Sequence, residues 1–221
     1  MGLTSYRKLF AIGDIHGCYD KLRQLLERLP YDREKDLLLF LGDYINRGQK
    51  SKEVISYLCD LKKNGAQLIT LMGNHEALLL EYQRQTDPAL VPLLRKLQLE
   101  LTLASYGLRD MSRLHKLAGL PEEHRKFLSE LQPYYQTEGY IFVHAGLYPG
   151  QTLEQQDSTS MSEIRDVFLD SDYDFGKVVV FGHSTFETPL VTPTKIGIDT
   201  GAVYGNMLTA LELPSRIFHH A

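Results

Sequence analysis

The sequence predicts an α/β protein whose strands and helices alternate along the first third of the chain. Three apolar runs, 9–12, 37–41 and 68–72, have the length and composition of buried strands, and a glycine-containing polar motif follows each. Segments with helical spacing of apolar residues lie between them. Further short apolar runs return after residue 139. These observations favour a layered fold in which helices cover the faces of β-structure.

The first 76 residues read as strand, helix, strand, helix and strand. Helical spacing marks the first helix at Leu22, Leu25, Leu26 and Leu29, before Pro30, and the second at Val54, Ile55, Leu58 and Leu61, before Asn64-Gly65. Strands joined through helices run parallel, with right-handed crossovers. We therefore expect a parallel βαβαβ core.

Residues 77–136 change to a purely helical pattern. Asp87 and Pro88 form a helix-start signal, with Asp87 as N-cap and Pro88 at the first helical position. Leucines spaced by three and four continue from Leu90 to Leu101, and another helix is expected after Pro121. This helical insertion is large enough to cover a face of the core or one side of a cleft.

Strand patterns resume in the last third of the chain. Apolar runs at 140–143, 178–181, 195–198 and 207–213 predict a second set of strands, and the polar segment 151–160 reads as a loop. The chain contains no linker, repeat or low-complexity run. We expect one domain over residues 1–221.

Composition limits the class of protein. Hydrophobic residues make up 43% and charged residues 24%, and the net charge of −4 argues against a stable nucleic-acid partner. Two cysteines, Cys18 and Cys59, are too few for a disulfide scaffold and suit a reducing compartment. No run of 18 apolar residues predicts a membrane span, and residues 1–8 do not read as a signal peptide. A cytoplasmic protein is expected.

Potential metal ligands follow the predicted strands, where ligand sites of α/β sheets form. They are Asp14, His16, Asp43, Asn74, His144 and His183. Carboxylates with imidazoles suit Mn, Fe or Zn better than Mg or Ca, and we expect Mn, with Fe and Zn as alternatives. The two oxygens of Asp43 could bridge two divalent ions. Such a pair, roughly 3.5–4 Å apart, would clamp a phosphoryl group and activate a water for in-line attack.

The remaining histidines and Cys18 lie outside this pattern. His115, His124, His219 and His220 occur in helical or tail contexts and are expected on the surface. Cys18 reads as a small apolar filler rather than a ligand.

The order of the motifs resembles the phosphoprotein phosphatase branch of the calcineurin-like metallophosphoesterases. The motifs are GDIHG at 13–17, GDYINRG at 42–48, GNHE at 73–76, HAG at 144–146, GHS at 182–184 and a closing segment at 198–205. The resemblance implies a β-sandwich flanked by helices, with two metals at its edge. It places Asp14, His16 and Asp43 on one metal, and it places Asp43, Asn74, His144 and His183 on the other.

The resemblance also implies roles around the metals. Arg47 matches a phosphate-binding arginine, and Arg165 resembles a second one, although Glu163 stands where an aromatic residue is usual. His75 matches the general acid or stabiliser of the leaving oxygen. Asn74 would contact substrate as well as metal. Tyr204 matches a tyrosine near the metals, with a buried core tyrosine as the alternative.

Two positions depart from the protein phosphatases. Asn46 replaces an aspartate that pairs with the histidine of GNHE, and Met72 replaces an arginine. An uncharged Asn46 would leave His75 a weaker acid unless another carboxylate, such as Glu76 or Asp199, stands beside it. The symmetrical dinucleoside tetraphosphatases also lack that aspartate, and their leaving group, a nucleotide phosphate, needs less protonation.

Together these features predict a dinuclear hydrolase that cleaves phosphomonoesters by attack of a metal-bound hydroxide. The first expected substrate is phosphoserine, phosphothreonine or phosphotyrosine in proteins, with Arg47, His75 and Asn46 as catalytic residues. The alternative is a symmetrical dinucleoside tetraphosphate hydrolase acting on a phosphorylated nucleotide. A non-catalytic binding module would show the loss of a metal ligand, and the sequence shows none.

Overall fold

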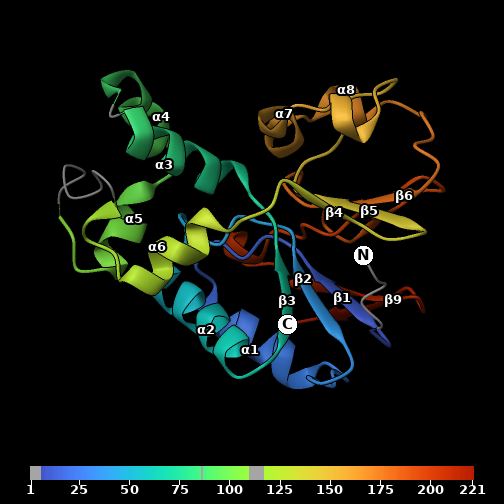
Figure 1. Cartoon of the computed structure of the whole chain (residues 1–221), viewed down its shortest axis with the longest axis horizontal. Coiled ribbons are helices and arrows are strands. Elements are labelled where there is room, and N and C mark those ends of the chain that lie inside the picture. Colours follow the sequence, from blue (N-terminus) through green and yellow to red (C-terminus); the bar gives the residue numbers. More distant parts are fainter. Residues whose placement is uncertain (1–5, 86, 110–116) are drawn as a thin grey trace.

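Two five-stranded sheets face each other in the computed structural model, which describes residues 6–85, 87–109 and 117–221 (Figure 1). The first sheet has the order β10-β9-β1-β2-β3, formed by Ile217–His220, Thr209–Leu213, Leu9–Ile12, Leu37–Phe40 and Gln67–Thr70. The second has the order β4-β5-β6-β8-β7, formed by Tyr134–Gln136, Tyr140–Val143, Val178–Phe181, Lys195–Gly197 and Leu190–Val191. The arrangement confirms the predicted mixed α/β class.

The parallel core of the first sheet is also confirmed. β1 pairs in parallel with β2, and β2 with β3. In β1, Leu9 and Ala11 pack against the second sheet, whereas Phe10 and Ile12 pack against helices. Side chains alternate between the two faces of a strand, so the all-apolar run is buried on both sides.

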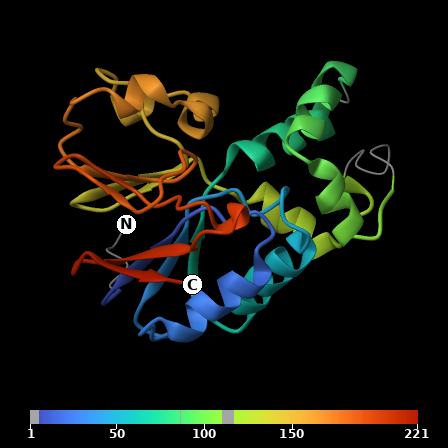
Figure 2. The ribbon, with the colours of Figure 1, turned by 180° about the vertical axis from the view of Figure 1, so that it is seen from behind.

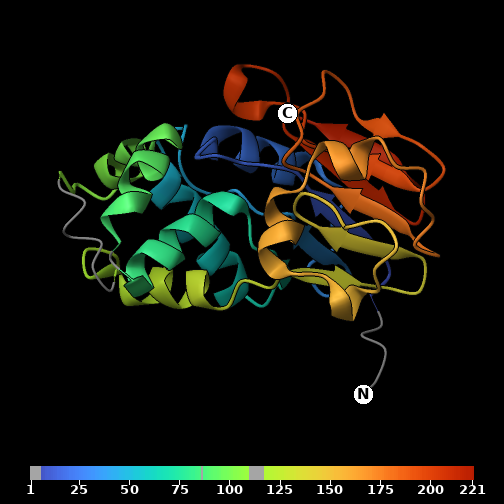
Figure 3. The ribbon, with the colours of Figure 1, turned by 90° about the horizontal axis from the view of Figure 1, so that it is seen from above.

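Helices cover the outer faces of both sheets (Figure 2). The first sheet is flanked by α1, Tyr19–Arg28, and α2, Ser51–Lys63, which share its core with the helical insertion. The insertion comprises α3, Asn74–Gln85, α4, Val91–Lys96, α5, Leu99–Ser105, and α6, Glu122–Ser129. The second sheet packs against α7, Ser158–Glu163, and α8, Asp166–Leu169. Seen from above, the insertion extends from one side of the sandwich (Figure 3). Within the described ranges, no helix combines the length and apolar character needed to cross a bilayer.

Four elements differ from the sequence prediction. The helical insertion expected over 77–136 ends earlier, because its last three residues form β4, which pairs antiparallel with β5 in the second sheet. The run 207–213 does not join the second set of strands, because β9 pairs antiparallel with β1 in the first sheet, where β10 continues it as a hairpin. The helix expected over Leu90–Leu101 is divided at Gln98, whose left-handed backbone, with φ 58°, separates α4 from α5. The expected loop 151–160 contains the start of α7, where the Asp157 side chain accepts from Ser160 N–H.

The surface assignment of His124 is wrong. Its imidazole is buried where α6 of the insertion packs on α2, with Nε2 3.1 Å from Ser56 Oγ and Nδ1 2.7 Å from Tyr106 Oη. Two partners 68 residues before and 18 residues before it in the sequence satisfy both ring nitrogens. His219 is also only partly exposed, whereas His220 is exposed. His115 lies outside the described residues.

Glu212 should make the stability of the fold pH-dependent. This buried carboxylate accepts from Lys8 Nζ at 2.8 Å, Ser215 Oγ at 2.9 Å and His219 Nε2 at 2.9 Å. Burial opposes its ionisation, but these donors outweigh burial and lower the pKa of Glu212 to about 2. A depressed folded-state pKa gives stability that is present above the unfolded value, about 4.5, and is lost as pH falls toward 2.

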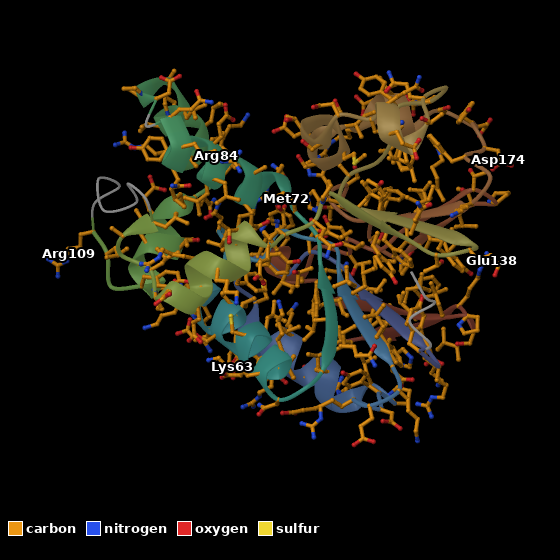
Figure 4. The ribbon with its side chains drawn as sticks, in the orientation of Figure 1. Lys63, Met72, Arg84, Arg109, Glu138 and Asp174 are labelled. Atoms are coloured by element: carbon orange, nitrogen blue, oxygen red, sulfur yellow. The ribbon has the colours of Figure 1, made fainter. Side chains whose placement is uncertain are left out.

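We therefore expect the free energy of unfolding to fall by about 2 kcal/mol more in the wild type than in Glu212→Gln between pH 6 and pH 3. Urea unfolding of the metal-free proteins at both pH values measures the difference. Glu138→Gln, at an exposed position (Figure 4), is the matched control and should follow the wild type. Equal pH dependence in the wild type and Glu212→Gln would remove Glu212 as its source.

Candidate functional site

Loops that follow strands of both sheets converge at one edge of the sandwich. The first sheet supplies the loops after β1, β2 and β3, and the second supplies those after β5 and β6. Their backbone is strained at non-glycine residues with positive φ, namely His16, Asp43, Asn46, Arg47 and His183. Residues held in left-handed conformations cost free energy and tend to cluster at functional sites. This clustering marks the edge as the candidate site.

Two glycines allow carboxylates into the loops. A Cβ at Gly73 would lie 2.2 Å from Asp43 Oδ1, and one at Gly182 would lie 2.1 Å from Asp14 Oδ1. Any side chain at either position would displace the acidic group. The glycines of GNHE and GHS therefore leave space for the carboxylates of Asp43 and Asp14, which come from other motifs.

The first group of possible metal ligands contains His16, Asp43 and His75, all buried. Asp43 Oδ2 lies 3.3 Å from His16 Nε2 and 3.8 Å from His75 Nε2. His16 Nδ1 lies 3.0 Å from the carbonyl oxygen of Ile45. Because a carbonyl oxygen can only accept, the proton of neutral His16 is on Nδ1, and the Nε2 lone pair faces the group.

The second group contains Asp43, His144 and His183. Asp43 Oδ1 lies 3.5 Å from His144 Nε2, so each oxygen of this carboxylate faces one group. His144 Nδ1 lies 2.9 Å from the carbonyl oxygen of Leu41, which directs Nε2 toward the site. Asn74 Oδ1 lies between the two histidines, 3.3 Å from His144 Nε2 and 3.1 Å from His183 Nδ1.

Asp14 lies next to these groups but belongs to neither. Its two carboxylate oxygens face the backbone N–H of His183, at 3.2 and 3.0 Å. Burial and the charge of Asp199 raise the pKa of Asp14 well above its usual value. The structure thus brings five of the six predicted ligands together and places the sixth where it holds the His183 loop.

The buried charges of the site shift one another's pKa. Burial opposes ionisation of Asp43, but neighbouring imidazoles, chiefly His75 and His144, hold the pKa of its carboxyl well below the usual range. Burial also opposes protonation of His144, yet Asp43 and Asp14 raise its pKa to about 10. Burial lowers the pKa of His75 and of His183 to about 3. Without a cation, a proton on His144 balances the carboxylates, a role that a metal ion can take.

Both predicted phosphate-binding arginines reach this edge. Arg47 Nη1 lies 3.4 Å from His16 Nε2 and donates to the hydroxyl of Tyr204, whose ring centroid is 5.5 Å from the guanidinium carbon. Tyr204 is 64% exposed, so the alternative of a core tyrosine is wrong. Arg165 Nη2 lies 3.1 Å from His183 Nε2. The arginines approach the two ligand groups separately.

Arg165 is placed by a buried lysine. It immediately precedes α8, and Lys195 Nζ donates to the carbonyl oxygens of Phe168 and Leu169 at the end of that helix, at 2.8 and 2.9 Å. A lysine charge satisfies the free carbonyl groups of a helix end. The strand β8 thereby fixes the segment that carries Arg165.

Neither carboxylate considered as a partner of His75 contacts it. Glu76 accepts from the backbone N–H groups of Asp43, Tyr44 and Ile45, at 3.0, 2.9 and 3.1 Å. Asp199 accepts from Thr185 Oγ1 and from a backbone N–H. The ring partner of His75 is Asn46, whose Nδ2 is 3.0 Å from His75 Nδ1.

Sequence reasoning missed the roles of Glu76 and Thr102. Glu76 fixes the Asp43 loop from the start of α3, and its place in GNHE was a signal that could have identified it. The hydroxyl of Thr102, in α5, accepts from the backbone N–H of Asn46 and donates to the Asn46 side-chain oxygen. No motif surrounds Thr102, and 56 residues separate it from Asn46, so the sequence carries no sign of this contact.

Two cavities are lined by a residue of the site or by residues close to the site in sequence. One, of about 380 Å³, is lined by Tyr19, Lys21 and Arg47 among others. The other, of about 550 Å³, lies between α3 and α7 and includes Met72, Arg84 and Glu163 in its lining. Figure 4 shows Met72 where the insertion meets the strands and Arg84 farther along the insertion.

Comparisons with known proteins agree with this geometry. Residues 7–202 match the family model described as calcineurin-like phosphoesterase. A symmetrical bis(5'-nucleosyl)-tetraphosphatase of Xanthomonas axonopodis pv. citri is 32% identical over 66% of the chain, which spans 41% of that relative. The asymmetrical bis(5'-nucleosyl)-tetraphosphatase PrpE of Halalkalibacterium halodurans is 30% identical over 94% of the chain and 90% of its own length.

Solved structures share the fold. A candidate diadenosine tetraphosphatase superposes with a TM-score of 0.75 at 22% identity, covering 100% of this chain and 95% of its own. A serine/threonine phosphatase from Saccharomyces cerevisiae superposes with a TM-score of 0.62 at 16% identity, covering 95% and 73%. At these identities the likeness concerns the fold alone.

Proposed function

The chain belongs to the calcineurin-like phosphoesterase family, and from that premise we propose that it is a metal-dependent hydrolase of dinucleoside polyphosphates such as diadenosine tetraphosphate. The two relatives described above, at 32% and 30% identity, are named bis(5'-nucleosyl)-tetraphosphatases, whereas the serine/threonine phosphatase, at 16% identity, is similar in fold. The comparisons therefore favour the alternative over the phosphoprotein substrate that was first expected. The chain spans about two fifths of the length of the symmetrical relatives that it matches. Their activity is therefore carried over to this chain as a proposal.

The donor set fits two divalent ions. In His16 and in His144 the Nδ1 proton is held by a backbone carbonyl, which directs Nε2 toward the site. An ion bound there would take the place of the Nε2 proton of His144. We propose that His16 and Asp43, with Asp14 beside them, would hold one ion. Asp43, Asn74, His144 and His183 would hold the other. The observation that carries this assignment is that each oxygen of Asp43 faces a different group.

When bound, the two ions would neutralise charge on phosphate oxygens and lower the pKa of a water. The side chains of the chain supply the rest. Arg47 and Arg165 would bind phosphate oxygens from the two sides, since a guanidinium presents paired donors. Tyr204 holds Arg47 in place through its hydroxyl. His75 Nε2 is buried and has no hydrogen-bond partner among the described residues, so it is free to contact the leaving oxygen.

The two cavities favour a substrate with a group at each end. One cavity includes Arg47, which contacts His16 of the first ligand group. The other includes Glu163, which is two residues before Arg165 in the sequence. Arg165 contacts His183 of the second group. In the second cavity, Met72 offers an apolar wall where the protein phosphatases have an arginine. We propose that each nucleoside of a dinucleoside polyphosphate binds in one of the two cavities, and that the phosphates bind at the edge of the sandwich.

Initial rates on diadenosine tetraphosphate and on a phosphoserine peptide, each with added Mn²⁺, test the proposal. We expect the dinucleotide to be the better substrate, and chromatography of its products to show which anhydride bond is cut. Two molecules of ADP would indicate symmetrical cleavage, and ATP with AMP asymmetrical cleavage. A protein that hydrolyses the peptide and leaves the dinucleotide intact would overturn the proposed substrate.

Replacing Arg47 tests the phosphate-binding role. Arg47→Ala should lower kcat/KM on diadenosine tetraphosphate about 10- to 100-fold, because a charge-assisted contact is typically worth about 1.5–3 kcal/mol. Metal content, measured by mass spectrometry of the elements, should stay unchanged. Arg23→Ala, at an exposed position on α1, is the control. Kinetics within twofold of the wild type would remove Arg47 from the site.

A further inference from the structure

Four buried polar side chains form a continuous chain that ends at His75. Ser51 Oγ lies 3.1 Å from Thr102 Oγ1, Thr102 Oγ1 lies 2.7 Å from Asn46 Oδ1, and Asn46 Nδ2 lies 3.0 Å from His75 Nδ1. Each residue is at most 2% exposed. The chain joins α2, α5, the loop after β2 and the start of α3. It therefore links the helical insertion to the candidate site.

The hydrogen bonds of this chain run in one direction. Thr102 Oγ1 accepts from the backbone N–H of Asn46 at 2.8 Å, and its own proton faces Asn46 Oδ1. The short 2.7 Å contact has the length of an O–H···O bond, and 3.0 Å suits an N–H donor. Ser51 then donates to Thr102. In this direction every hydroxyl proton has an acceptor.

The reverse orientation of the Asn46 amide leaves a proton without a partner. With the amide turned, Thr102 would accept from Asn46 Nδ2 and donate to Ser51. Ser51 Oγ contacts only Asn46 N and Thr102 Oγ1 within the described residues, so its own proton would have no acceptor. A buried hydroxyl without a partner is costly. The Thr102 hydroxyl thus holds the amide with Nδ2 toward His75.

We propose that Thr102 is a positioning residue that, through Asn46, holds His75 as the neutral imidazole with its proton on Nε2. An amide NH₂ group can only donate, so His75 Nδ1 must accept and carries no proton. The remaining proton is on Nε2, which is buried, without a partner among the described residues and 3.8 Å from Asp43 Oδ2.

This tautomer gives His75 one role and excludes another. A protonated Nε2 has no lone pair for a metal ion, so His75 is not a ligand although it lies in the first group. It presents an N–H donor instead. On the proposed function, that donor meets the leaving oxygen of a phosphoanhydride, a nucleotide phosphate that needs a hydrogen bond more than a proton. By holding His75 as this donor, Thr102 favours substrates whose leaving group needs a hydrogen bond and no proton transfer.

Nitrogen NMR of the imidazoles tests the tautomer without substrate or metal. In metal-free protein labelled with ¹⁵N-histidine, the His75 signals are identified by their absence from His75→Asn. We expect the wild type and Thr102→Ser to show a protonated Nε2 and a bare Nδ1. Thr102→Val, which lacks the hydroxyl, should show protonation of Nδ1. Asn46→Asp, which offers an acceptor, should also protonate Nδ1 and serves as the positive control.

The outcomes separate this proposal from the proposed function. A wild-type His75 with its proton on Nδ1 would overturn the proposal, whatever the Thr102 variants show. An unchanged tautomer in folded Thr102→Val would overturn the role of Thr102. Turnover of diadenosine tetraphosphate should fall on the order of 10- to 100-fold in Thr102→Val and be restored in Thr102→Ser, with metal content unchanged. If the protein does not hydrolyse dinucleotides, the proposed function fails, but His75 can still show the predicted tautomer.

Discussion

Asp43→Asn should remove metal from both ligand groups and lower turnover by more than about 10³-fold. Asparagine offers one neutral oxygen, so it cannot present an anionic oxygen to each group, as Asp43 does toward His16 and His144. Asp14→Asn should weaken only one metal site. Elemental analysis of the purified variants, with kinetics on diadenosine tetraphosphate, measures both effects.

Asp60→Asn, at an exposed position on α2, is the matched control and should keep metal and activity. Normal occupancy of two ions with normal turnover in Asp43→Asn would show that this carboxylate does not bridge two sites.

Glu76→Gln should disable the site without touching a metal ligand. The carboxylate accepts three backbone N–H groups of the segment 43–45, in which Asp43 has a φ of 53°. A glutamine side chain has a single acceptor oxygen and would direct its NH₂ group at a backbone donor, which costs about 1–3 kcal/mol in a buried position. We expect a similar loss in the free energy of unfolding and a loss of turnover on the order of 100-fold.

Glu100→Gln is the control for this change, because Glu100 is exposed on α5 of the same insertion and lies away from both cavities. Urea unfolding and steady-state kinetics of both variants give the comparison. Glu76→Gln with wild-type stability and turnover would mean that the Asp43 loop keeps its conformation without the carboxylate.

The sequence was sufficient to predict the parallel core and the edge where most of the proposed ligands meet. Asp43, Asn74 and His144 follow buried strands, and strand ends of one sandwich edge lie together whatever the details of packing. The same reasoning failed for β9, which was expected in the second set of strands, because an apolar run carries no information about which sheet it joins. Register and partner are set by tertiary packing, here against β1.

The residues around His75 show a second limit. The departure at Asn46 was visible in the sequence, and it raised the question of which group faces His75. The answer required Thr102, which comes from an insertion with no motif. Likewise His124 looked like a surface residue until the structure placed Ser56 and Tyr106 beside its ring. Contacts across many residues of sequence leave no local pattern.

A titration of metal-free protein with Mn²⁺, followed by hydrolysis of diadenosine tetraphosphate, tests the central claim most directly. The protein is stripped with a chelator, and the initial rate is measured against the number of ions bound per chain. We predict no turnover without metal and a rate that saturates at two ions per chain. Full turnover by the chelated protein, or saturation at a single ion, would contradict a dinuclear centre built on Asp43.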